Sequence, residues 1–155
     1  MPKKIGVITI VCGGQGTGKT PIIKSLIKKS GAKRKYVFDP RHEYPDDFIR
    51  FYRFAEFSRV FPAITDATIV IEEATGFLEA QKDMDIAEKL IAVEHHRNVI
   101  YFVFHSLIDI PPYILRYAKF LILLETGDDP EKIRRDRPKI YPYFIKKKRQ
   151  VIQLK

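Results

Sequence analysis

The sequence contains no tryptophan, only two methionines and a single cysteine, Cys12. One cysteine excludes an internal disulfide and is typical of a protein from a reducing compartment. The longest stretch without a charged residue, residues 5–18, is interrupted by glycines. It is shorter than the roughly 20 apolar residues that a membrane-spanning helix needs. The amino-terminal residues also lack the apolar region and cleavage site of a secretion signal. We therefore expect a cytoplasmic protein without a membrane segment.

Acidic residues are scarce near the carboxy-terminal end of the chain. Residues 132–155 carry ten basic side chains and one acid, Asp136, which accounts for the whole formal net charge of +9. The rest of the chain balances basic against acidic residues. A neutral body with a basic tail favours a polyanionic partner. The alternative is a solvated tail that only increases solubility.

The length and hydropathy of the chain indicate one α/β domain. With 155 residues, of which 45% are hydrophobic, the chain is large enough to bury a core. Its apolar, β-branched runs are continuous rather than alternating, which is typical of strands covered on both faces in a parallel sheet. Helix-compatible segments separate these runs, so a doubly wound, mostly parallel sheet of five strands, or slightly more, is predicted. The expected strands are residues 5–11, 35–38, 68–71, 99–104 and 120–124.

The segments between these runs predict the helices and the domain boundary. Helices are expected over residues 19–29, 85–95 and 112–117, with Asp83 or Asp85 as the N-cap of the second. The aromatic-rich segment 41–67 predicts one or two short helices whose rings pack in the core, and residues 141–154 predict a terminal hairpin. Residues 1–127 would form the core, and residues 128–155 a basic extension of the same domain.

The glycine-rich segment 13–20 matches the Walker A pattern G-x-x-x-x-G-K-[ST] completely. It follows an apolar strand and opens an amphipathic helix, which is the context that the motif requires. Its backbone amides and the helix dipole suit phosphate, Lys19 supplies a cation for the β- and γ-phosphates, and the Thr20 hydroxyl suits Mg²⁺. The predicted nucleotide-binding residues are Gly13, Gly14, Gln15, Gly16, Thr17, Gly18, Lys19, Thr20 and Pro21.

Two adjacent acids follow the expected strand 68–71. Charges at the end of a buried strand are costly unless they are paired or bind a metal. Since adjacent strand residues point to opposite faces, Glu72 and Glu73 cannot have the same role. We assign Glu72 to the Mg²⁺ shell, and Glu73 to the water that attacks the γ-phosphate. The alternative is an exposed pair of acids at a helix start.

A third polar pair follows the expected strand 99–104. Ligands of open α/β sheets bind at the carboxyl ends of the strands, so His105 or Ser106 is a candidate sensor of the γ-phosphate. Either residue is equally compatible with an ordinary, hydrogen-bonded loop position.

With these motifs the chain resembles the FtsK/HerA class of P-loop ATPases, which have a RecA-like (ASCE) fold. Besides the phosphate loop, three segments carry the resemblance: the D-P-x-x-E-Y turn at residues 39–44, the I-V-I-E-E-A strand at residues 69–74, and an arginine segment at residues 95–98. The similarity spans residues 5–125. The sensor position, usually glutamine in that class, is His105 or Ser106 here. The short chain is most similar to small viral or mobile-element packaging ATPases and, more distantly, to filamentous-phage assembly ATPases.

The resemblance implies an oligomeric motor. In this class the active site is completed between subunits of a ring, usually hexameric, by an arginine from a neighbour, for which Arg97 is the first candidate and Arg116 the second. Lys146, Lys147, Lys148 and Arg149 would then contact DNA phosphates without reading bases. A viral protein of this kind would act in the host cytoplasm.

The sequence therefore predicts Mg²⁺-dependent ATP hydrolysis coupled to DNA packaging or translocation. A small-molecule or nucleotide kinase is the main alternative, with the arginines of segment 134–137 as a lid over the phosphates. Paired acids after the third strand suit water activation better than an acceptor pocket. A slowly hydrolysing, nucleotide-dependent binding module is the third possibility.

Overall fold

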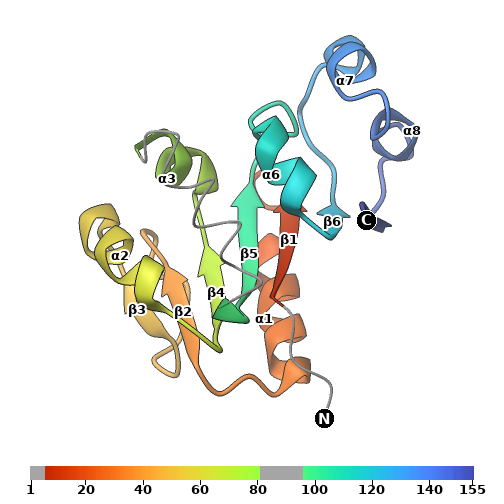
Figure 1. The fold of residues 1–155 in the computed structure, drawn as a ribbon. Coiled ribbons are helices and arrows are strands. Elements are labelled where there is room, and N and C mark those ends of the chain that lie inside the picture. Colours follow the sequence, from red (N-terminus) through yellow and green to blue (C-terminus); the bar gives the residue numbers. More distant parts are fainter. Residues whose placement is uncertain (1–5, 81–95) are drawn as a thin grey trace.

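The computed structural model describes residues 6–80 and 96–155, which form a single sheet flanked by helices (Figure 1). The sheet order is β3-β2-β4-β5-β1-β6-β7, and only the β6–β7 pair is antiparallel. The predicted mostly parallel α/β sheet is thus confirmed, with two strands, β3 and β7, beyond the five expected. The strands are β1 (Val7–Cys12), β2 (Lys35–Phe38), β3 (Ile49–Phe51), β4 (Thr68–Ile71), β5 (Val99–Phe104), β6 (Phe120–Leu123) and β7 (Gln150–Gln153).

Helices cover both faces of the sheet. Helix α1 packs on one face, and α2, α3 and α6 lie on the other (Figure 1). The helix expected over residues 85–95, with its N-cap at Asp83 or Asp85, lies outside the described residues. The helices are α1 (Lys19–Ser30), α2 (Phe54–Val60), α3 (Ala74–Ala80), α6 (Pro112–Tyr117), α7 (Pro130–Asp136) and α8 (Tyr141–Phe144), with a 3₁₀ turn η1 (Phe61–Ala63).

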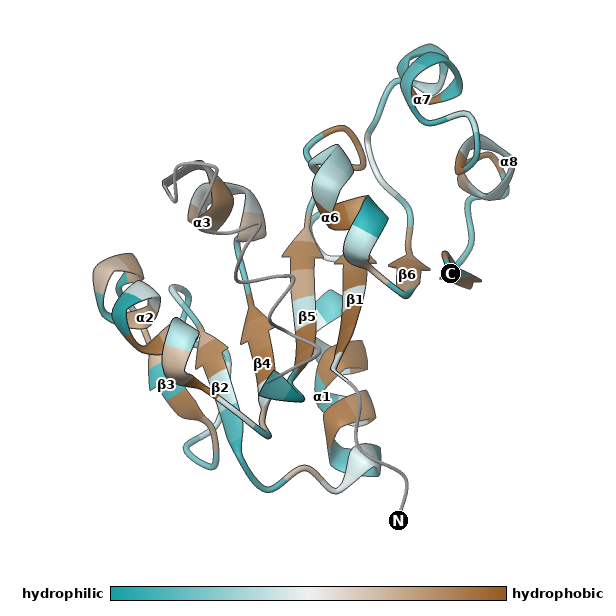
Figure 2. Cartoon of the chain, in the orientation of Figure 1, coloured by the Kyte–Doolittle hydropathy of each residue, from teal (hydrophilic) through white to brown (hydrophobic). Residues whose placement is uncertain are grey.

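Strand β1 lies between β5 and β6 and is buried on both faces. Alternate side chains enter two separate apolar clusters: Ile10 packs with the α2, α3 and α6 side, and Val11 packs with Ile23 and Ile27 of α1. Figure 2 shows β1, β4 and β5 as largely hydrophobic strands, with hydrophilic residues on the outer surfaces of the helices. Two-sided burial explains why these strands read as unbroken apolar runs.

The aromatic residues after β2 form part of the core, as expected. The Phe57 ring lies 5.7 Å from Phe38 and 5.4 Å from Phe77, between centroids, and both Phe48 and Phe61 are buried. Tyr52 is an exception, because its side chain is exposed and not part of the core. These side chains pack α2 and α3 against the β2–β4 side of the sheet.

The predicted terminal hairpin is wrong. Residues 141–144 form α8, in which Pro142 occupies the first turn, where a missing N–H is tolerated. Strand β7 instead pairs with β6, with Leu121 opposite Ile152, and Ile152 is buried in the core. The basic extension therefore completes one edge of the sheet.

Across the described ranges, no helix combines the length and the apolar character needed to cross a membrane.

Asp128 connects the segments that follow β5 and β6. Its carboxylate accepts hydrogen bonds from the Leu107 amide (2.8 Å), from the Ile108 amide (3.3 Å) and from the Ser106 and Thr126 hydroxyls. Burial alone would raise the pKa of Asp128, but these donors together hold that pKa below its ordinary value. The carboxylate therefore stabilises the fold at neutral pH, and this contribution is lost as the pH falls through the lowered pKa.

Replacing this carboxylate tests its contribution. Asp128→Asn should lower the free energy of unfolding by about 1–2 kcal/mol at pH 7, since hydrogen bonds to a charged acceptor are strong but half-exposed groups are partly screened. The difference from wild type should shrink in acid. Urea unfolding at several pH values measures it, with Asp109→Asn, at an exposed position, as the control. Equal stability of Asp128→Asn and wild type at pH 7 would contradict the assignment.

Candidate functional site

The glycine-rich loop lies at the carboxyl end of β1 and leads directly into α1. Gly18 precedes the helix with φ of 93°, a left-handed conformation that favours glycine. Gly13 is required for packing: a Cβ there would lie 2.6 Å from Thr17 Oγ1 and 2.9 Å from Leu124 Cβ. The loop is also anchored to both neighbouring strands, since the Gly13 amide donates to Phe104 O (3.1 Å) and the Gly14 amide donates to Glu125 O (2.8 Å).

Lys19 is folded back over this loop. Its buried ammonium donates to Gly13 O (2.6 Å) and Gly14 O (2.8 Å). Burial lowers the pKa of Lys19, and the negative charge of Glu72 acts in the opposite direction. Lys19 lines a cavity of about 350 Å³, and among the described residues its ammonium donates to these two neutral carbonyl oxygens. A phosphate at that position would offer it a charged acceptor.

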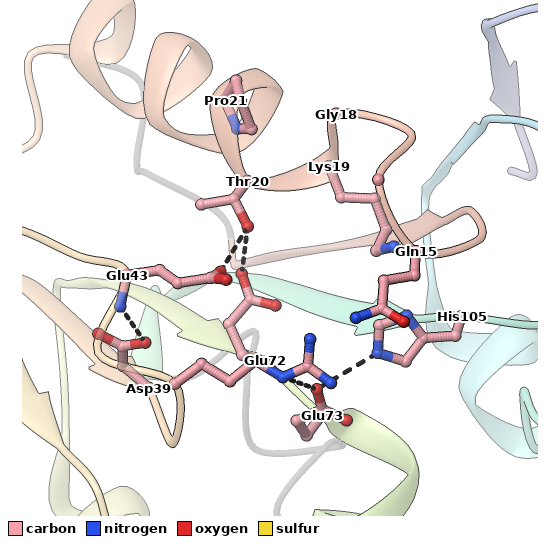
Figure 3. A pocket seen from close by; sticks show the side chains of 12 residues that line it. Gln15, Gly18, Lys19, Thr20, Pro21, Asp39, Glu43, Glu72, Glu73 and His105 are labelled. Atoms are coloured by element: carbon pink, nitrogen blue, oxygen red, sulfur yellow. Dashed lines mark hydrogen bonds and ion pairs between the residues drawn. The ribbon is translucent and has the colours of Figure 1, made fainter.

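Thr20 brings together two carboxylates from distant parts of the chain. Its Oγ1 lies 3.2 Å from Glu43 Oε2 and 3.3 Å from Glu72 Oε1, as Figure 3 shows. One hydroxyl proton cannot satisfy both acids at once, so the site has more acceptors than donors. A hard cation with oxygen ligands fits this arrangement. Since the described residues hold no group of three or more His, Cys, Asp or Glu that would bind a metal alone, the cation would also need oxygens from a ligand.

The turn after β2 holds Glu43 in place. The Asp39 carboxylate accepts hydrogen bonds from the Glu43 and Tyr44 amides, each at 2.9 Å. The Tyr44 hydroxyl then donates to Glu72 Oε1 at 2.7 Å. Burial raises the pKa of Glu72, although this hydrogen bond and the one from Thr20 act to lower it. The turn thus orients both acids that face Thr20.

Glu73 has different partners from Glu72, although both residues lie in the turn after β4 and line the same cavity, so strand alternation is not the cause of the difference. Its Oε1 lies 3.2 Å from Arg41 Nε and 3.3 Å from His105 Nε2 (Figure 3). The backbone of Glu73 is left-handed, with φ of 53°, so the chain turns sharply between β4 and α3. Glu73, Arg41 and His105 line the same cavity as Lys19 and Thr20.

The structure separates the two candidate sensors. His105 lines the cavity, whereas the Ser106 hydroxyl donates to Asp128. The buried His105 Nδ1 has no hydrogen-bond partner among the described residues. Of the two, His105 is therefore the residue placed to meet a ligand.

The two candidate arginines lie away from this cavity. Arg97 precedes β5, at the opposite edge of the sheet, where its guanidinium pairs with both Asp66 oxygens at 2.7 and 2.8 Å. Arg116 is on α6. Neither lines the cavity around Lys19, so neither completes the site of its own chain.

The four residues predicted to bind a polyanion lie in two different surroundings. Lys147, Lys148 and Arg149 line a second cavity beside the phosphate loop, and the Lys146 ammonium lies 5.6 Å from the centre of the Tyr143 ring.

Sequence reasoning missed the contributions of the β2–β3 turn. It noted the motif at residues 39–44 but gave Arg41, Glu43 and Tyr44 no role. An arginine and a glutamate in a turn after a buried strand are a weak signal by themselves. Glu72 and Glu73, which follow β4, are the acids whose contacts make this turn part of the site.

A double-mutant cycle tests the coupling between Tyr44 and Glu72. Tyr44→Phe and Glu72→Gln, alone and together, should give a coupling of about 1 kcal/mol in urea unfolding, because the pair forms a part-buried hydrogen bond to a carboxylate. A cycle pairing Tyr36→Phe, at a hydroxyl bonded to exposed Arg34, with Glu72→Gln is the control and should show no coupling. Additive effects of Tyr44→Phe and Glu72→Gln would contradict the geometry.

The fold is similar to those of several solved structures. The genome packaging NTPase B204 from Sulfolobus turreted icosahedral virus 2, in complex with AMP, matches with a TM-score of 0.75 and 15% identity, over 99% of this chain and 94% of B204. The N-terminal domain of zonular occludens toxin from Neisseria meningitidis matches with a TM-score of 0.60 and 13% identity, over 85% of this chain and 91% of that domain.

The RadB recombinase is a more distant structural match, with a TM-score of 0.57 and 18% identity, over 82% of this chain and 78% of RadB. No family model and no curated protein sequence matches the chain. The predicted mostly parallel α/β fold is thereby confirmed, and it is similar to the folds of the B204 packaging NTPase and the RadB recombinase.

Proposed function

We propose that this chain is a Mg²⁺-dependent ATPase that drives DNA packaging or translocation. The observation that carries the proposal is the convergence of Lys19, Thr20, Glu72 and Glu73 around one cavity at the carboxyl edge of the sheet. Structures of B204, which has a similar fold, contain ATP-gammaS and AMPPCP, and B204 is described as a DNA-packaging ATPase. The combination of fold and site favours the same chemistry here.

The phosphate loop and α1 would bind the triphosphate. The helix start and the loop amides supply partial positive charge, and Lys19 exchanges its two carbonyl contacts for oxygens of the β- and γ-phosphates. Thr20 and Glu72, with Glu43 beside them, would hold Mg²⁺, which neutralises charge on the phosphates. A cation there would also offset the cost of burying the Glu72 carboxylate.

Glu73 would orient the attacking water and accept its proton. Its carboxylate is held between Arg41 and His105, so its position depends on both side chains. Arg41 is a positioning residue in this scheme, because it acts through Glu73. His105 would sense the γ-phosphate from its position in the cavity beside Glu73.

Ring assembly would supply the missing arginine. Arg97 of one copy, or Arg116 as the second candidate, would reach the γ-phosphate of a neighbouring copy. The Arg97–Asp66 pair is exposed, and exposed ion pairs contribute little to stability, so a phosphate can compete with it. A hexamer is the expected assembly, with DNA phosphates bound by basic residues of the carboxy-terminal extension.

The kinase alternative has less support. Arg134 pairs with Glu131 at 2.7 Å and Arg135 pairs with Asp136 at 2.9 Å, all on α7. Neither arginine lines the cavity around Lys19, so they do not form a lid over it.

Substitution of Glu73 separates binding from hydrolysis. Glu73→Gln should bind ATP with near wild-type affinity and hydrolyse it at least about 100-fold more slowly, because the general base is lost. Phosphate release and binding of a fluorescent ATP analogue measure the two steps, with Glu131→Gln as a matched control on α7. Hydrolysis by Glu73→Gln at the wild-type rate would contradict the role, and transfer of phosphate to a nucleoside or metabolite would indicate a kinase.

Nucleic acid should stimulate the reaction. We expect the ATPase rate to rise on adding DNA, and the stimulation to fall steeply with salt, because phosphate contacts release counterions. Steady-state rates with and without DNA, at several salt concentrations, test this. An identical rate under all conditions would remove DNA from the proposal while leaving ATP hydrolysis in place.

A further inference from the structure

A second cavity, of about 460 Å³, lies against the outer side of the phosphate loop. The loop and α1 contribute Thr17, Gly18 and Ile22 to it, the end of β6 contributes Leu124 and Glu125, and the turn before β7 contributes Lys147, Lys148 and Arg149. Gly18 lines both this cavity and the one around Lys19. A ligand with phosphates at Lys19 can therefore extend past Gly18 into the second cavity.

The turn at residues 147–149 is built into the fold. The Lys147 amide donates to Phe144 O at 3.3 Å, and Lys147 has a left-handed backbone with φ of 49°. The Gln150 side-chain amide donates to Tyr143 O (2.7 Å) and Lys148 O (3.2 Å). Because β7 pairs with Leu123 opposite Gln150, the antiparallel register carries Arg149 toward Leu124. The turn is thus held beside the phosphate loop.

We infer that this second cavity binds the base and ribose of the nucleotide, and that Lys147, Lys148 and Arg149 contact the nucleotide rather than DNA. The inference rests on the proposed function, since it places the nucleoside part of the triphosphate bound at Lys19. It assigns three of the four residues predicted to bind DNA to a different ligand.

The chemistry of the lining residues fits a nucleoside. Ile22 and Leu124 offer apolar surface to a planar ring, and Leu124 is buried. A guanidinium such as that of Arg149 stacks on aromatic faces, and lysines beside it suit the ribose and the α-phosphate. Glu125 is the one acid in the lining, and its carboxylate is an acceptor for a ribose hydroxyl or an exocyclic amino group. A purine nucleoside triphosphate meets all of these groups.

The mixed lining of this shallow, open hollow distinguishes it from a DNA path. Non-specific DNA binding uses cations spread along a surface that follows the phosphate backbone. Here the cations converge on a cavity that also contains apolar residues and an acid. The basic residues on α7, Lys132, Arg134 and Arg135, line neither cavity.

Inorganic tripolyphosphate provides the decisive comparison, because it has the phosphates of ATP without the nucleoside. Arg149→Ala should weaken ATP binding about tenfold, equivalent to the loss of one stacked cation, while tripolyphosphate binding changes less than about twofold. Arg149→Lys keeps the charge but loses the planar group, so it should also weaken ATP selectively. Calorimetry on the full chain measures both ligands, and thermal melts confirm that the variants fold.

A matched control is Arg134→Ala, which removes the same charge outside both cavities. It should leave binding of both ligands unchanged, and DNA affinity, measured by fluorescence anisotropy, should fall no more for Arg149→Ala than for this control. Equal loss of ATP and tripolyphosphate binding would show that Arg149 acts on phosphates and would overturn the inference. So would unchanged ATP binding, with or without a selective loss of DNA binding. A chain that binds ATP selectively through Arg149 but never hydrolyses it would refute the proposed function alone.

Discussion

The site depends on how the phosphate loop is fixed to the strands on either side of it. The Gly13 amide bonds to the end of β5 and the Gly14 amide to Glu125, just after β6, so the loop connects the two strands that flank its own. Parallel strands bring all their carboxyl ends to one edge, which is why β4 and β5 deliver Glu73 and His105 to the same cavity. The close fit of Gly13 against Thr17 and Leu124 leaves no room for a side chain. Without that contact the loop amides, Lys19 and Thr20 would lose their common orientation.

Asp128 and Glu72 show that the surroundings of a carboxylate determine its role. Asp128 receives hydrogen bonds from two backbone amides and two hydroxyls, so its pKa is lowered and its charge stabilises the fold. Glu72 receives only two side-chain donors in a more buried place, so its pKa is raised and its charge is unfavourable. A group that destabilises the unliganded fold is a group whose charge a bound cation can relieve. The contrast supports a structural role for Asp128 and a ligand-binding role for Glu72.

The sequence predicted the central strands and the phosphate loop correctly. Each element that it missed or predicted wrongly has its own physical reason. Continuous apolar runs predicted the parallel strands because those strands are buried on both faces, and the Walker A motif predicted the loop because glycines and Lys19 stand at a fixed spacing. Strand β3 has three residues with Arg50 in the middle, so it forms no continuous apolar run in the sequence. The hairpin prediction failed because β7 pairs with β6 and not with the segment before it, and residues 141–144 form α8. The contacts of Arg41 and Glu43 arise only when the β2–β3 turn meets β4, which no local pattern encodes.

The neighbouring positions of His105 and Ser106 have a mechanical consequence. His105 faces the cavity and contacts Glu73, while the next residue bonds to Asp128, one residue before the Asp129 cap of α7. A backbone rotation at His105 would therefore pull on the whole set of hydrogen bonds around Asp128. Because Asp128 and the Asp129 cap are consecutive, hydrogen bonds connect the residue after the histidine to the first turn of that helix.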